Sequence, residues 1–124
     1  MTNIKPLVEN VMSYIPLTDA QNARDLDRAC SDLNRVLRMD ARYADEEANE
    51  FLSHLIGLLK EAMITSRMYI HSLVMGEENS NYKIKFIQAK MELSEILSDL
   101  LENMQESNYY DSLRRAELEF RMRR

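Results

Sequence analysis

The chain has 124 residues, of which only 2 are glycine and 2 are proline, a composition that excludes collagen-like and loop-rich β folds. This length suits one domain, and an apolar content of 45% argues against wholesale disorder. A formal net charge of −5 disfavours general binding to polyanions such as nucleic acids.

The first predicted element is a short amphipathic helix over residues 4–15. Its apolar residues recur at spacings of three and four and so share one face: Ile4, Leu7, Val8, Val11, Met12 and Ile15. Pro6 is tolerated in the first turn of a helix, and Pro16 ends this one.

A second helix is predicted to run to about Met39. Thr18 and Gln21 have the spacing of a capping box, in which the Thr18 hydroxyl accepts an early backbone N–H and Gln21 reaches back. The apolar positions of this helix are Ala23, Leu26, Cys30, Leu33 and Leu37. They predict that one side of the helix packs against the core.

The opposite side of this second helix carries a stripe of arginines without a single lysine: Arg24, Arg28, Arg35, Arg38 and Arg42. A guanidinium pairs bidentately with a carboxylate or a phosphate, so the stripe indicates a docking surface for a partner of opposite charge. The alternative is a solvated face whose charges contribute little, with Arg28–Asp32 and Arg42–Glu46 as pairs one turn apart.

A third helix of about 30 residues is predicted to end at Met75, with Gly76 placed just past its end. One side carries core positions such as Phe51, Leu55, Ala62 and Tyr69. A second apolar face lies roughly opposite and consists of Gly57, Ile64, Met68 and Met75. A helix that is apolar on two sides must be covered on both, either by the first helix or the C-terminal tail, or by another chain. Methionine is flexible and suits a surface that adapts to a partner.

A fourth helix is predicted from about Tyr82 to Gln105, completing a bundle domain over residues 1–108. Its acidic residues form a stripe that faces away from the core: Glu92, Glu95, Asp99, Glu102 and Glu106. This stripe is a candidate ligand for a basic groove, with carboxylates in the place of phosphates. Residues 109–124 are predicted to form a short basic C-terminal helix or tail.

The sequence carries no pattern typical of catalysis, a cofactor or a metal. His54 and His71 are 17 positions apart, which on one helix separates them by about 25 Å. Cys30 is the only cysteine and falls on an apolar face, which predicts an inert core thiol and fits a reducing, cytoplasmic compartment. Neither a signal peptide nor a membrane-spanning segment is expected. We therefore expect a protein that is not an enzyme.

These patterns predict an all-α protein, an antiparallel bundle of three to four main helices with short flanking helices. The function they favour is that of a small, acidic, non-catalytic interaction protein, such as an adaptor, a chaperone-like binder or an inhibitor. It would bind a protein partner through the Met-rich helix face and the charged stripes and would form a homo-oligomer, with a two-fold dimer favoured. Two alternatives remain: a nucleic-acid accessory protein that uses the arginine stripe, and an acidic mimic that blocks a nucleic-acid-binding protein.

Overall fold

The computed structural model describes residues 4–17, 19–42, 46–76, 80–104, 118 and 121–122. Four α-helices follow one another in the chain: α1 (Lys5–Tyr14), α2 (Ala20–Asp40), α3 (Glu46–Val74) and α4 (Ser80–Met104). No strand occurs in these described ranges. The predicted all-α bundle is therefore confirmed, and the four predicted helices agree with the observed ones to within a few residues. The predicted fifth helix or tail lies almost wholly outside the described residues.

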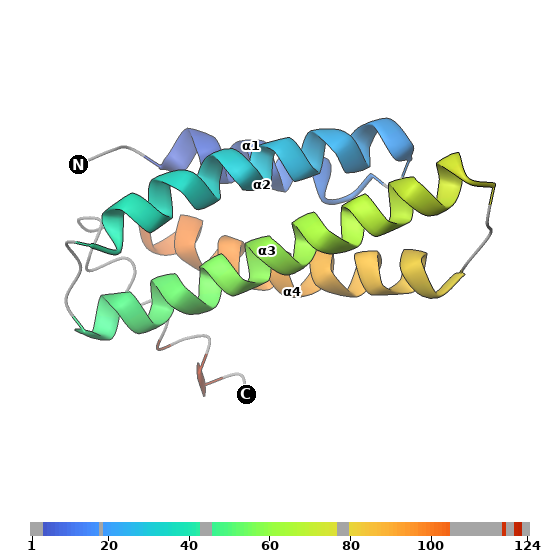
Figure 1. Cartoon of the computed structure of the whole chain (residues 1–124). Helices are drawn as coiled ribbons and strands as arrows, with labels where there is room; N and C mark the ends of the chain where they lie inside the picture. The colour runs from blue at the N-terminus through green and yellow to red at the C-terminus, as the bar shows by residue number, and fades with distance from the viewer. Residues whose placement is uncertain are drawn as a thin grey trace.

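The helices run up and down in sequence order, and each packs against its neighbours in the chain (Figure 1). α2 packs between α1 and α3, whereas α4 packs between α3 and α1. Within the described helices there is no close backbone approach between α2 and α4, nor between α1 and α3. α2 and α4 therefore occupy diagonally opposite corners of the bundle, and their outward faces point away from each other.

The core is built from the apolar faces that the helical spacing predicts. All four helices contribute fully buried side chains, among them Val8, Val11, Leu26, Leu33, Phe51, Leu59, Phe86 and Leu97. Burying these faces stabilises the fold by roughly 25 cal/mol for each Å² of apolar surface removed from water. The predicted core side of α3 is confirmed, since Phe51, Leu55 and Ala62 are all buried.

The N-terminus of α2 is capped by Asp19, so the predicted capping box at Thr18 is wrong. The Asp19 backbone is extended, and its carboxylate accepts the backbone N–H of Asn22 at 2.8 Å. Gln21 does not reach back to the cap; its amide donates to Asp25 at 3.2 Å. A carboxylate in this position satisfies an unpaired N–H and also faces the positive end of the helix dipole.

The end of α3 follows the prediction at Gly76. This residue has a φ of +69°, a region that glycine enters without steric cost, and its N–H donates to the carbonyl of Leu73 at 3.2 Å. The last turn of α3 and the first turn of α4 extend past the α1–α2 connection, which makes the α3–α4 hairpin the longer half of the bundle (Figure 1).

Candidate functional site

The five predicted arginines are all exposed and lie along the outward side of α2; we call them the Arg surface. Arg35 pairs with Asp32, with 3.1 Å between Nη2 and Oδ1. The predicted Arg28–Asp32 pair is wrong, because Asp32 pairs with Arg35 instead. Among the described residues, no ion pair joins Arg42 to Glu46. Most of the positive charge on this surface is thus not neutralised by the described carboxylates.

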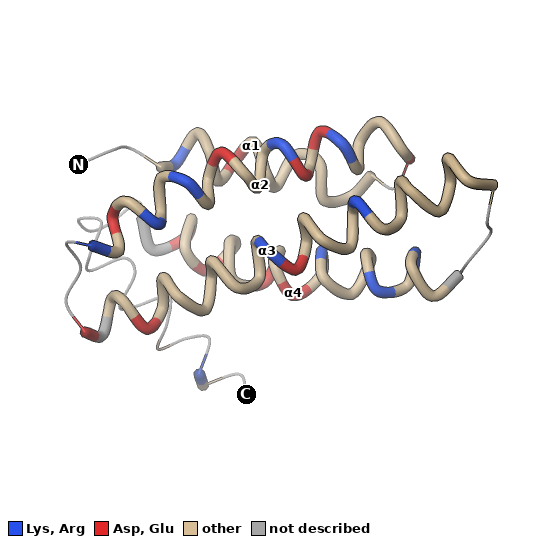
Figure 2. Tube along the Cα trace, viewed as in Figure 1, with Lys and Arg blue, Asp and Glu red and all other residues tan. Residues whose placement is uncertain are grey.

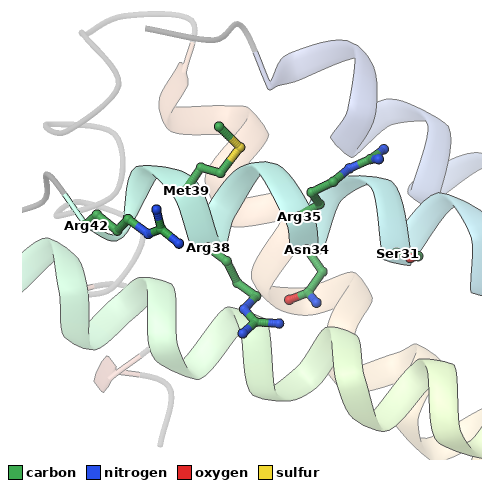
Figure 3. Close-up of a pocket in the computed structure, with 6 residues that line it drawn as sticks. All are labelled: Ser31, Asn34, Arg35, Arg38, Met39 and Arg42. Carbon is green, nitrogen blue, oxygen red and sulfur yellow. The ribbon is translucent and has the colours of Figure 1, made fainter.

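A hollow of about 340 Å³ opens at the C-terminal half of the Arg surface. Its lining residues are Ser31, Asn34, Arg35, Arg38, Met39 and Arg42. Asn34 and Arg38 point from α2 toward α3, whereas Arg35 and Met39 project from the other side of the helix (Figure 3). Within the described part of the chain, the buried Oδ1 of Asn34 accepts no hydrogen bond. The hollow combines three guanidinium groups with the half-exposed thioether of Met39, so it suits an anionic ligand that also has an apolar part.

One ion pair joins α2 to α3 beside this surface. Arg67 Nε donates to Asp27 Oδ2 at 3.0 Å, and the aspartate is the more buried of the two partners. Because Arg67 neutralises the carboxylate of Asp27, the Arg surface is more positive than the sequence of α2 alone suggests.

The second apolar face of α3, which we call the α3 seam, consists of Gly57, Ile64, Met68 and Met75. Ile64 is 51% exposed and Met75 is 60% exposed, while Met68 is half-buried. Around Gly57 the surface is open, since a Cβ atom added there would meet nothing within 4 Å. α1 makes no backbone contact with α3 in the described ranges, so the expectation that the first helix covers this face was wrong. The proposed cover by residues 109–124 lies largely outside the described residues.

The acidic stripe on α4 is interrupted at Asp99. Glu92, Glu95 and Glu102 are exposed as predicted, and we call these three residues the acidic surface. Asp99 is only 3% exposed, so its predicted orientation toward solvent was wrong. It lies one turn after the buried Ile96, at the edge of the core side of α4. Glu106 lies outside the described residues.

α4 carries a buried lysine that was not predicted from the sequence. Lys90 donates from Nζ to the backbone carbonyl of Leu17 at 2.8 Å, and its ammonium lies 4.5 Å from the centre of the Phe86 ring. Phe86 in turn stacks on Tyr69 of α3, with 5.5 Å between the ring centres. Burial lowers the pKa of Lys90 below its usual value of 10.5. Helical spacing was the available signal, because Phe86, Lys90, Leu93 and Leu97 recur every three to four residues.

The nucleophilic and metal-binding side chains are dispersed. Cys30 is fully buried, and desolvation, with a smaller effect from the charge of Asp27, raises the pKa of its thiol to about 12. A thiol in that state is a poor nucleophile, which agrees with the core role predicted for it. His54 and His71 both lie exposed on α3. Across the described ranges, no three His, Cys, Asp or Glu side chains lie close enough to hold a metal ion together.

Comparison with known proteins finds no matching family model, no significantly similar curated protein and no significantly similar solved structure. None of the helices in the described ranges has an apolar stretch long enough to cross a bilayer. The α3 seam, the Arg surface and the acidic surface are therefore the features that bear on function.

Proposed function

We propose that this chain is a non-catalytic interaction protein that binds a protein partner through the α3 seam. The exposure of Ile64 and Met75 is the observation that supports the proposal most strongly. These side chains continue a face that runs along α3 from Gly57, and no helix of the bundle packs over it in the described ranges. Apolar residues aligned along one exposed helix face are typical of a surface that a partner covers.

The charged surfaces on the neighbouring helices would then orient the partner. Exposed charges at an interface contribute more to partner choice and association rate than to affinity. The proposal includes a reducing, cytoplasmic location, which the single buried Cys30 supports. Self-association also belongs to the proposal, although the diagonal placement of α2 and α4 favours a geometry other than the two-fold dimer predicted from the sequence.

The experiment that tests the proposal compares two glutamate substitutions at matched positions. Ile64 and Ile84 are the same residue type and are both 51% exposed, but only Ile64 lies in the α3 seam. Each tagged variant and the wild type would be used to capture proteins from a nuclease-treated lysate of the source organism. A partner of the seam is captured by the wild type and by Ile84→Glu, and its yield falls at least about tenfold with Ile64→Glu, since a buried charge at an apolar contact costs more than about 1.4 kcal/mol.

The same captures supply the outcome that contradicts the proposal. If Ile64→Glu retains every partner of the wild type, the α3 seam is not the binding face. Circular dichroism of both variants provides the folding control, because neither side chain is in the core and both variants are expected to remain helical.

A second candidate function, a nucleic-acid accessory protein, is favoured by the arginine-lined hollow on α2. It predicts that a labelled oligonucleotide binds the wild type in about 50 mM salt, and that affinity falls steeply as salt rises, because phosphate contacts release counterions. An anisotropy titration with wild type and Arg38→Gln measures this directly. The inverse candidate, an acidic mimic, would use the exposed carboxylates of α4 and requires a basic protein partner with no affinity of the chain for oligonucleotides.

A further inference from the structure

Two surfaces of opposite charge lie at opposite corners of this bundle. The Arg surface lies on the outward side of α2 and the acidic surface on that of α4. Figure 2 shows the charged positions along the two helices, which lie diagonally across the bundle. In the described ranges, Arg35 is the one member of the Arg surface with an ion-pair partner, and Glu92, Glu95 and Glu102 have none. Among the described residues, four of the five arginines and all three glutamates therefore have no ion-pair partner.

The two surfaces also match in spacing and in their apolar content. Arg35 and Arg42 are seven residues apart, as are Glu95 and Glu102, and seven residues correspond to about 10.5 Å along a helix. Each surface includes an exposed methionine, since Met39 is 59% exposed and Met91 is 63% exposed. Two helices packed about 8–10 Å apart would place the guanidinium groups against the carboxylates and bury both thioethers beside them.

We propose that the Arg surface of one chain binds the acidic surface of a second copy. Because α2 and α4 are diagonally opposite, one contact cannot use both surfaces of both chains, as a two-fold dimer would require. The contact is instead heterologous: each added copy leaves one Arg surface and one acidic surface free for the next copy. Self-association through these faces therefore continues beyond two chains.

A second copy fits these surfaces better than a nucleic acid does. A phosphate backbone would contact the Arg surface alone and would leave the acidic surface without a partner. The exposed thioether of Met39 adds apolar contact with a protein helix, whereas a phosphate backbone offers it no apolar partner. The second copy supplies both an acidic helix and an apolar side chain, and both are present on α4. This inference does not depend on the α3 seam.

Light scattering of the full chain over a range of concentrations tests the proposal. In about 20 mM salt the average mass should rise with concentration past that of a dimer, and in about 300 mM salt the association constant should fall at least about tenfold, because salt screens exposed charges. Ile64→Glu should assemble like the wild type, because Ile64 belongs to neither charged surface. A failure of the proposed function at the α3 seam is thereby distinguished from a failure of this assembly. Lys83→Gln/Lys85→Gln removes two exposed positive charges of α4 that belong to neither surface, and it should also assemble like the wild type.

Two further variants each remove the two matched charges of one surface and leave the other surface intact. Arg35→Gln/Arg42→Gln keeps the acidic surface fully charged, and Glu95→Gln/Glu102→Gln keeps the Arg surface fully charged. Each should be monomeric alone, and an equimolar mixture should form dimers that grow no further, because each chain has one usable face. The proposal is overturned if the wild type stays monomeric at about 1 mM chain in low salt, if it stops at a dimer, or if the mixture does not pair. A wild type that is monomeric but binds an oligonucleotide through Arg35 and Arg42 would also overturn it, and would assign the Arg surface to nucleic acid.

Discussion

α2 and α3 are neighbours in the bundle, yet they divide their surfaces differently. α2 has one apolar side, which is buried, and one charged side, which is exposed. α3 has the same kind of buried side, but part of its outward side is apolar as well, at Ile64 and Met75. The packing of a single chain accounts for every apolar residue on the core side of α2, whereas none of the four described helices covers the α3 seam. The two helices are therefore alike in their buried apolar sides and differ in the apolar content of their outward sides.

The largest expected effect tests whether the two core sides are equivalent. Leu33→Ala in α2 and Leu59→Ala in α3 each remove a fully buried side chain, so each should lower the free energy of unfolding by about 2–5 kcal/mol. Urea denaturation of both variants measures the change. Met39→Ala, at an exposed position of α2, is the control and should stay within about 0.5 kcal/mol of the wild type. A loss at Leu59 much smaller than at Leu33 would break the equivalence.

The next effect concerns Lys90, the buried lysine of α4. Lys90→Ala removes the hydrogen bond to Leu17 and the contact with Phe86, and should cost about 1–2 kcal/mol. Because the folded pKa of Lys90 lies below the unfolded value of 10.5, the unfolded state binds more protons between these two values. The stability contributed by the wild-type lysine should therefore rise with pH as pH approaches 10.5.

Denaturation of wild type and Lys90→Met at several alkaline pH values checks the sign of this effect. Methionine has no titrating group, so the difference in stability between the two proteins should shift in favour of the wild type as pH increases. A difference that stays constant, or shifts toward Lys90→Met, would contradict the burial-lowered pKa.

A smaller effect is expected where α2 and α3 are joined at their surface. The Asp27–Arg67 pair is partly solvated, since the arginine is mostly exposed, so a double-mutant cycle with Asp27→Ala and Arg67→Ala should give a coupling of about 0.5–1 kcal/mol. The same cycle in high salt should give a smaller value. No measurable coupling at low salt would mean that packing alone sets the angle between the two helices.

The smallest expected effect on stability concerns Ile64, on the outward side of α3. Ile64→Ala should change the free energy of unfolding by less than about 0.5 kcal/mol, because half of this side chain is already exposed in the single chain. Urea denaturation at low chain concentration measures it, with Leu59→Ala as the buried counterpart on the same helix. A loss of 2 kcal/mol or more, on the order of a core truncation, would show that the seam is part of the core in solution.

Much of this architecture could be predicted because the helical period is strong and breakers are few. The apolar spacing located the core sides of α2 and α3, and Gly76 marked the end of α3 through its positive φ. The cap of α2 was placed one residue too early, since Thr18 and Asp19 are adjacent and both are good capping residues. Element boundaries of this kind depend on local backbone geometry that residue type alone does not specify.

The errors at the candidate surfaces have a different cause. Asp99 was assigned by residue type to solvent and the burial of Lys90 was not predicted, whereas the helical positions of both border the core side of α4. The expected Arg28–Asp32 pair required a choice between two arginines at similar distances, which spacing alone does not decide. Spacing within each helix also did not reveal that α2 and α4 lie at diagonal corners, because that relation depends on how four helices pack together. The diagonal arrangement thus changed the inferred assembly from a two-fold dimer to a heterologous one that continues beyond two chains.

The buried thiol of Cys30 offers a way to measure how often the helical bundle opens. Alkylating reagents react with thiolates, and here the thiol is both shielded from reagent and held in its protonated form near neutral pH. Modification therefore requires α2 to separate from the helices that cover it, so the labelling rate follows the population of open molecules. With one sulfhydryl in the chain, the fraction of molecules that carry the single mass shift measures this opening without an engineered cysteine.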